Sequence, residues 1–377
     1  MSTVTILTTS ASSFREEHNY LEKSVEECVL TNVLEKAKAI YDLENYEFEQ
    51  VGGHDGGRNL VYVCKQKEEK KYVLRISALG DRTMEEYEAE TEFVHYLAEN
   101  GASVADVIPS RSGKLVERMQ VKPSVIGLSE AADGAEGDAE CFVSLFAYAK
   151  GILLSENGYH YRDGAPLSEL FYNMGKTIGA IHRLSKQYRP THQRQQYFDK
   201  YNMEYVDKVI PDTYVELKAA IADRLERFRT LPVDPESYGL VHFDFSDGNY
   251  HVDFSDGAIT TFDFDNCIYC WYMFDLAHLW THGVGWCQWM PDGEKRLAYM
   301  NEEYFATILE GYRSETTVSE ELLEKLPLFI DMVLIEGIVD EFGCAAREGE
   351  EPDPEDVEDY VKCLVEAIPY AGIGVDL

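Results

Sequence analysis

The chain carries the stretch HFDFSDGN at residues 242–249 and, fourteen residues after its last residue, the stretch DFD at residues 263–265. Phosphoryl transfer needs a carboxylate that takes the proton of the acceptor hydroxyl, and an amide oxygen and a second carboxylate that hold magnesium. Asp244, Asn249 and Asp263 occur in the order and at the spacing that these three roles require in a kinase. The two stretches therefore predict a kinase-type catalytic loop and metal site.

The alternative interpretation is that these stretches are surface turns, and a repeat within the chain allows a comparison. The residues DFSDG occur at 244–248 and again at 253–257. The second copy lies between two strand-like runs. Its last residues, 255–257, are therefore predicted to form a hairpin turn in which Gly257 supplies a positive φ. Such a hairpin would deliver Asp263 beside Asn249, as a shared metal site requires.

Composition favours a folded protein with two lobes or domains. The chain has 377 residues, of which 45% are hydrophobic and 12% aromatic, which is ample for a buried core. The first residues lack the basic and apolar regions of a signal peptide. The most apolar window, Pro327–Val339, is interrupted by Asp331 and Glu336 and does not predict a membrane span. We therefore expect a cytoplasmic protein.

The eight cysteines are scattered, and in a cytoplasmic chain we expect reduced thiols. The stretch CIYC at 267–270 is the closest pair, with His278, His282 and Cys287 downstream. A structural zinc site needs a second close pair or a well-spaced histidine pair. The sequence therefore does not predict zinc there.

The formal net charge of -35 argues against binding of nucleic acids or anionic membranes, which needs clustered lysine and arginine. A negative field favours cationic small molecules through long-range steering. The alternative is an acidic surface that serves solubility alone. Because ATP is itself an anion, magnesium and local cations would have to offset this field at a nucleotide site.

The first half of the chain has a strand-rich pattern. A helical stretch at 24–41 precedes a strand at 46–51, a glycine-rich run at 52–57 and a return strand at 59–64. A glycine-rich hairpin can approach nucleotide phosphates closely because it lacks Cβ atoms, which makes Gly53 and Gly56 candidate phosphate contacts. A plain flexible turn explains the same glycines.

A strand cation that contacts phosphate and pairs with a helix glutamate is the next kinase feature. Arg75 lies in the strand at 71–77, and Glu90 lies in a helix at 83–100, with Glu86 as the second choice. Alternatively, Arg75 lies on an edge strand and Glu90 is one solvated charge among many. Further strands are expected at 104–109, 114–121 and 141–148, where backbone groups at Phe146 and Tyr148 would recognise adenine.

The second half has helical periodicity, with helices expected over 166–188, 205–231, 301–313, 318–344 and 353–368. An acceptor pocket built by these helices would draw on acids or aromatic residues, which suit a cationic or polyol acceptor. A solvated face and a buried core are the ordinary explanations for the same residues. The candidates are Asp331, Glu336, Asp340, Trp271, Tyr272, Trp280, Trp286 and Trp289.

With these residues in hand, the chain resembles the aminoglycoside phosphotransferase and choline kinase-like family over nearly all of 45–345. The most specific parts are the two stretches described first, DLA at 275–277, and a helix ending with Ile178-Gly179-Ala180-Ile181-His182. The resemblance implies an α+β, bilobal protein-kinase-like fold with a five-stranded antiparallel N-lobe and a mainly helical C-lobe. We expect an N-terminal helical extension at 1–44, the N-lobe at 45–148 and the C-lobe at 149–377.

The resemblance also implies Mg²⁺-dependent transfer of the γ-phosphate of ATP to a hydroxyl of a small molecule, with GTP left open as the donor. It implies that Asp244 is the catalytic base, that Asn249 and Asp263 bind the metal, that His242 orients the loop, and that Asp275 supports it. Arg75 departs from the usual lysine, and its forked guanidinium changes the expected phosphate contact.

Two other functions compete with this interpretation. A protein kinase of the same fold would need an activation segment, but only twelve residues separate Asp263 from Asp275. The second alternative is a nucleotide-binding pseudokinase, and Arg75 is the one residue that supports it. The sequence leaves the identity of the acceptor and the oligomeric state open.

Overall fold

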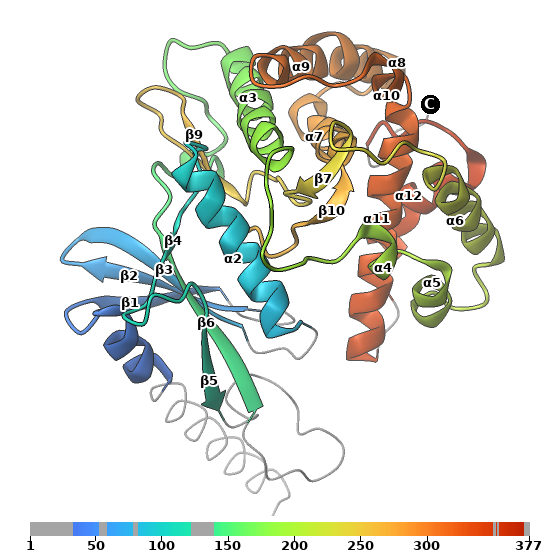
Figure 1. Cartoon of the computed structure of the whole chain (residues 1–377). Helices are drawn as coiled ribbons and strands as arrows, with labels where there is room; N and C mark the ends of the chain where they lie inside the picture. The colour runs from blue at the N-terminus through green and yellow to red at the C-terminus, as the bar shows by residue number, and fades with distance from the viewer. Residues whose placement is uncertain are drawn as a thin grey trace, which may run out of the picture. The chain divides into compact units, whose positions relative to one another are not determined.

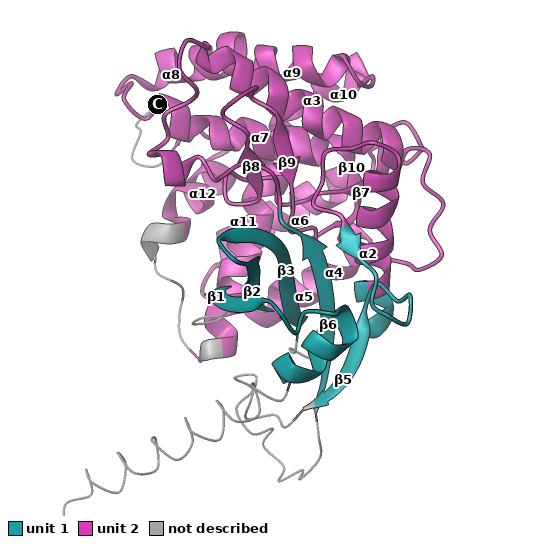
Figure 2. Cartoon of the chain, turned by 90° about the vertical axis from the view of Figure 1, so that its left-hand side faces the viewer, with its two compact units in different colours: residues 1–87, 107–148 teal, residues 88–106, 149–377 magenta. Residues whose placement is uncertain are grey.

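The computed structural model describes residues 33–52, 59–77, 82–121, 139–349, 352 and 354–372. The chain divides into two compact units, which Figure 2 shows in different colours. The first comprises residues 1–87 and 107–148, and the second comprises residues 88–106 and 149–377. Our division at residues 44/45 and 148/149 stays a prediction.

The first unit is built on one antiparallel sheet (Figure 1). Its strands follow the order β1-β2-β3-β6-β4, and β5 also pairs with β6. A helix over 33–41 packs Val33, Ala37 and Tyr41 into the same apolar core as Leu74 and Val143. The strands are β1 (Glu47–Gly52), β2 (Asn59–Gln66), β3 (Glu69–Ser77), β4 (Val107–Ile108), β5 (Glu117–Val121) and β6 (Ala139–Ala147).

The sheet has six strands, and the expectation of five is wrong. β4 pairs with Leu145 and Phe146 of β6, whereas β5 pairs with residues 139–143 of the same strand. Pro109 and the turn at Gly113, whose φ is 81°, lie between them. Because proline and this turn interrupt the ladder, the two predicted strands at 104–109 and 114–121 stay separate and share one edge of β6.

Helix α2 (Met84–Glu99) begins with reciprocal hydrogen bonds between Thr83 and Glu86. The backbone N–H of Thr83 donates to Oε2 of Glu86 at 2.8 Å, and the backbone N–H of Glu86 lies 3.3 Å from Oγ1 of Thr83. This capping box explains why the helix begins here. Gly101, with φ of 86°, follows its C-terminus, as the sequence predicted.

The second unit is mainly helical. In Figure 1, α3 runs beside α9 and α7 beside α11, and these pairs are in contact. Gly175 and Gly311 allow the first pair to approach, since a Cβ at these positions would meet the carbonyl oxygens of Ile308 and Tyr172 at 1.9 and 2.0 Å. The helices are α3 (Leu167–Ser185), α4 (Tyr197–Lys200), α5 (Met203–Val209), α6 (Val215–Phe228), α7 (Tyr272–Cys287), α8 (Gly293–Tyr299), α9 (Ala306–Arg313), α10 (Glu320–Leu323), α11 (Leu326–Glu348) and α12 (Pro354–Glu366).

Two expected helices are each broken in two. The stretch 205–231 forms α5 and α6, because Pro211 lies between them and cannot continue a helix. The stretch 318–344 forms α10 and α11, and Pro327 occupies the first turn of the second helix. A π-helical segment, η3 (Met300–Phe305), precedes α9. Throughout the described ranges, none of the helices has the length and apolarity that crossing a membrane would need.

Candidate active site

The catalytic-loop stretch lies in the second unit between two small antiparallel ladders. It follows β7 (Tyr238–Val241), which pairs with β10 (Ile268–Trp271), and it precedes β8 (Tyr250–Val252), which pairs with β9 (Ile259–Thr261). The predicted hairpin is confirmed, with φ of 79° at Gly257. The backbone N–H of Phe262 donates to the carbonyl of Asn249 at 2.9 Å. The hairpin therefore returns the chain so that Asp263 follows directly beside Asn249.

Asp275, at the start of α7, anchors the loop. Its carboxylate is fully buried and accepts hydrogen bonds from the backbone N–H groups of His242 and Phe243, both at 2.9 Å, and from Nε2 of His182 at 3.0 Å. Although burial opposes it, these bonds and the nearby histidines hold the pKa of Asp275 below its ordinary value. Phe243 has φ of 73°, and its ring stacks on Phe274 at 4.1 Å. The loop is thus held in a strained backbone conformation by its surroundings.

His242 connects the loop to the segment after β9 that carries Asp263. Its Nδ1 accepts from the backbone N–H of Asp244 at 3.3 Å, so the proton lies on Nε2, which donates to the carbonyl of Phe262 at 3.0 Å. Burial lowers the pKa of His242, which fits a neutral ring with one donor and one acceptor. The imidazole therefore orients two segments without adding a charge.

Asp244 and Asn249 lie together at the end of the loop. Nδ2 of Asn249 donates to the backbone carbonyl of Asp244 at 2.8 Å, and this leaves the amide oxygen to face another group. Burial raises the pKa of Asp244 above its ordinary value, while the neighbouring His242 opposes the shift. A carboxylate with a raised pKa is a better proton acceptor than an exposed one.

Asp263 is exposed and has φ of 60°, a conformation that aspartate tolerates better than most residues. The turn after it is fixed by Arg194, a buried residue that the sequence analysis missed. Nε of Arg194 donates to the carbonyl of Cys267 at 2.7 Å, and a terminal nitrogen donates to the carbonyl of Asp265 at 2.6 Å. Because an arginine binding backbone carbonyls has no motif, no sequence signal could have found it.

The donor set fits a divalent cation shared with phosphate. Asn249 offers an amide oxygen and Asp263 a carboxylate, which are the hard oxygen ligands that Mg²⁺ prefers. Among the described residues, no cluster of three histidine, cysteine, aspartate or glutamate side chains could hold a metal unaided. The two ligands would therefore need oxygen atoms from the nucleotide to complete the coordination.

The predicted nucleotide contacts lie largely in the first unit. Arg75 of β3 is buried, and its guanidinium lies over the rings of Phe146 and Tyr87, at 5.0 and 5.9 Å from their centroids. The backbone N–H of Tyr148 donates to the carbonyl of Lys71 at 2.9 Å. Glu90 is buried on the part of α2 that belongs to the second unit, so its pairing with Arg75 stays a prediction. Gly53 and Gly56 lie outside the described residues.

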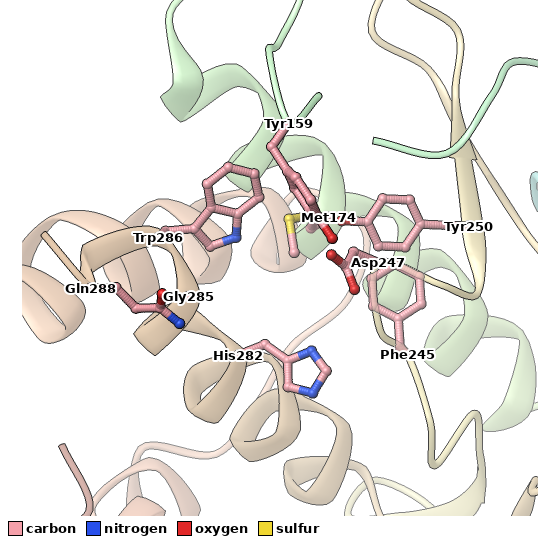
Figure 3. A pocket seen from close by; sticks show the side chains of 9 residues that line it. All are labelled: Tyr159, Met174, Phe245, Asp247, Tyr250, His282, Gly285, Trp286 and Gln288. Carbon is pink, nitrogen blue, oxygen red and sulfur yellow. The ribbon is translucent and has the colours of Figure 1, made fainter. Parts of the chain in front are cut away.

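A cavity of about 500 Å³ opens beside the catalytic loop in the second unit (Figure 3). Asp247 of the loop contributes a carboxylate to its wall, and the hydroxyl of Tyr159 points toward this carboxylate. The charge of Asp247 and a hydrogen bond to it raise the pKa of Tyr159. The other lining residues are Met174, Phe245, Tyr250, His282, Gly285, Trp286 and Gln288.

Of the aromatic acceptor candidates, only Trp286 lines this cavity. Trp271, Tyr272 and Trp280 are core residues that are at most 3% exposed, and Trp289 is 74% exposed. Tyr159 and His282 carried no sequence signal, because Tyr159 lies in an irregular segment and His282 has the sequence context of an ordinary buried histidine. Asp247 could have been suspected from its place in the catalytic loop.

The acids on α11 are placed away from that cavity's lining. Asp331 pairs with Arg224 at 3.0 Å, and Asp340 pairs with Lys200 at 2.7 Å. Burial raises the pKa of Glu336 well above its ordinary value, and the charges of Asp340 and Asp244 raise it further. Asp331 and Asp340 are thus each paired with a cation, whereas Glu336 interacts electrostatically with Asp244.

The CIYC stretch is structural. Cys267 and Cys270 are buried thiols that form no disulfide, and burial raises the pKa of Cys270 well above its ordinary value. A buried protonated thiol neither binds metal nor reacts readily.

Comparison with known proteins gives consistent results. The model of the family described as "Phosphotransferase enzyme family" matches residues 50–315. The amicoumacin kinase of Bacillus subtilis (strain 168) is 28% identical over 324 residues, which cover 85% of this chain and 87% of that protein. The solved structure of amicoumacin kinase hAmiN in complex with AMP-PNP, Ca²⁺ and Ami has a TM-score of 0.71 at 22% identity, covering 92% of this chain and 95% of that one. A microcompartment-associated aminopropanol kinase has a TM-score of 0.61 at 18% identity, covering 91% and 100%. The two solved structures confirm the protein-kinase-like fold.

Proposed function

The chain belongs to the phosphotransferase enzyme family. We therefore propose that it uses Mg²⁺ and ATP to transfer the γ-phosphate of ATP to a hydroxyl of a small amine-bearing molecule. The observation that carries the proposal is Asp244, a partly buried carboxylate with a raised pKa. It lies in a loop that Asp275 holds and that His242 joins to the segment of Asp263.

Asp244 is the general base in this proposal. The acceptor hydroxyl gives its proton to the Asp244 carboxylate while its oxygen forms the new bond to the γ-phosphorus. The bond from phosphorus to the β,γ-bridging oxygen breaks, and ADP leaves with the electron pair. The hydrogen bond from Asn249 to the backbone of Asp244 keeps the base and the metal-site amide in one arrangement.

Asn249 and Asp263 would hold Mg²⁺, which when bound neutralises the charge that develops on the phosphates. The hydrogen bond between Phe262 and Asn249 supports this assignment, since it joins the two ligand-bearing segments. On the nucleotide side, we assign Arg75 to the phosphates and Glu90 to its support. We assign Gly53 and Gly56 to the phosphate loop, and the backbone at Phe146 and Tyr148 to adenine. GTP stays open as an alternative donor.

The cavity beside the loop suits a cationic acceptor. Its wall combines the carboxylate of Asp247 with the aromatic faces of Trp286 and Tyr159, which can attract an ammonium group by charge and by cation–π interaction. The net charge of -35 favours the approach of a cation. The relatives are named for amicoumacin and for aminopropanol, a compound with both an amine and a hydroxyl. We therefore place amicoumacin and aminopropanol first among the acceptors to test.

The comparisons weigh against the competing functions. The relatives and solved structures described above are kinases of small molecules, whereas a protein kinase would act on a polypeptide. A pseudokinase would have lost part of its catalytic set, but the base and both proposed ligands are present in this chain.

The test is acceptor-dependent release of ADP from Mg-ATP, with amicoumacin, aminopropanol, choline, aminoglycosides, homoserine, sugars and a generic protein substrate. We expect release with an amine-bearing small molecule. Release with the protein substrate alone would instead establish a protein kinase.

The variant Asp244→Asn tests the base. It should lower kcat by about 10²–10⁴-fold, the usual contribution of general-base catalysis, while the Kd for Mg-ATP stays unchanged. Undiminished turnover in this variant would show that Asp244 is not the base.

A further inference from the structure

His282 lies on α7, two turns after the loop anchor Asp275, and its ring forms one side of the cavity in Figure 3. The residue is partly exposed because it faces the cavity. The charges of Asp244 and Asp247 both reach the ring, which places it near the proposed base and near the acidic wall of the cavity.

The ring of His282 has no hydrogen bond to any described residue. By contrast, His182 bonds to Asp275 and Tyr312, His242 bonds to Phe262, and Nδ1 of His251 lies 2.9 Å from the carbonyl of Ala149. Because the partly exposed His282 ring faces the cavity, a ligand bound there can supply the partners that the protein does not.

Two further polar atoms beside the cavity are unmatched. The hydroxyl of Tyr250, a fully buried residue that lines the cavity, has no hydrogen-bond partner among the described residues. Nδ1 of His278 is likewise buried without a partner among them, and the His278 ring lies 4.4 Å from that of His282. Unmatched polar groups therefore collect beside the cavity, contrary to what a purely apolar pocket requires.

The charge state of His282 decides which ligand groups fit. Burial and the adjacent His278 lower its pKa to about 3, although Asp244 and Asp247 oppose this shift. At neutral pH the ring is uncharged, with one nitrogen that donates and one that accepts. It therefore does not repel an ammonium group at Asp247, and it can both give a hydrogen bond to a hydroxyl and receive one from it.

We propose that His282 and the Tyr250 hydroxyl form a polar subsite that binds a second hydroxyl or amine of the acceptor, beside the hydroxyl that is phosphorylated. This inference rests on the proposed function. It predicts an acceptor with at least one polar group, a hydroxyl or an amine, besides the hydroxyl that is phosphorylated. The two side chains position the acceptor and take no part in the proton transfer to Asp244.

The experiment compares His282→Phe, which keeps a ring but loses both nitrogens, with His282→Asn, which can still donate and accept. Tyr250→Phe removes a single hydroxyl, and His160→Asn is the matched control at an exposed histidine. Amicoumacin and aminopropanol are the probes. For each protein, KM for the probe, KM for ATP and kcat are measured, and probe binding is measured by calorimetry in the presence of Mg-AMP-PNP.

His282→Phe and Tyr250→Phe should raise the KM and Kd of the better probe by about tenfold, because each leaves a polar group of the acceptor unmatched. The KM for ATP should stay within about twofold. His282→Asn should recover most of the loss, and His160→Asn should match the wild type. A merely structural effect would instead alter ATP binding too and would not be rescued by asparagine.

The outcomes separate this inference from the proposed function. If the wild type phosphorylates a probe and either phenylalanine variant keeps its KM, the subsite assignment for that residue is wrong while the kinase function stands. If the wild type phosphorylates neither probe, the same variants are measured with any amine-bearing acceptor that the screen identifies. If no amine-bearing compound of the screen is phosphorylated, the amine-bearing acceptor class is refuted, and the polar subsite is refuted with it.

Discussion

Replacing Asp275 by asparagine tests whether one buried carboxylate holds the catalytic loop in place. The carboxylate accepts three hydrogen bonds at 2.9–3.0 Å, from the backbone of His242 and Phe243 and from His182. Asparagine has nearly the same shape but offers one acceptor oxygen and one NH₂ group. If its oxygen keeps the bonds of His242 and His182, its NH₂ group faces the N–H of Phe243, and two buried donors oppose each other.

The expected cost follows from these bonds. A buried donor left without an acceptor costs about 1–3 kcal/mol, and each of the two remaining bonds loses about 1 kcal/mol when its acceptor is no longer charged. The sum of about 3–5 kcal/mol agrees with the range for breaking one partner of a buried charged network. Since Phe243 already has φ of 73°, we expect the loop to relax and kcat to fall together with stability.

The assay is urea unfolding at pH 7 with the slope of the transition compared between proteins, together with kcat for the acceptor found in the screen. The control is Asp212→Asn, which removes the same charge from a side chain that is 100% exposed and should leave both quantities unchanged. A stability loss below about 1 kcal/mol with full kcat would refute the claim that Asp275 holds the loop.

Two further perturbations test the helical core of the second unit. Glu336→Gln should stabilise the protein at pH 8 more than at pH 5. Burial raises the pKa of Glu336 in the folded state. The wild type therefore loses stability as the pH rises from the unfolded-state pKa toward the folded-state pKa, by up to about 1.4 kcal/mol per pH unit. Equal shifts in Tm at both pH values would contradict this. Gly311→Ala should lower the free energy of unfolding by about 1–3 kcal/mol, because the added Cβ would meet the Tyr172 carbonyl oxygen at 2.0 Å. The control in the same thermal melts is Gly285→Ala, because a Cβ at that position would meet no atom within 4 Å.

The sequence predicted the parts of the site that depend on local rules. The loop, the hairpin and the return of Asp263 to Asn249 follow from the spacing of polar residues, the alternation of the strands and one glycine turn. The breaks at Pro211 and Pro327 obey local rules as well, since a proline inside a helical pattern ends or begins a helix. The family and its fold were predictable for the same reason, because the diagnostic residues are close together in the chain.

Only the tertiary structure decided which side chains surround the loop. His182 reaches Asp275 across 93 residues of sequence, and Arg194 reaches Asp265 across 71, so neither contact has a period or motif that a sequence pattern could reveal. Trp286 lines the cavity while Trp280 is buried, although both lie on α7, because the packing of α3 and η3 against that helix determines which face stays open. The proposed catalytic residues thus lie in a short stretch of the chain and could be predicted from it, whereas the acceptor cavity depends on helix contacts between distant segments.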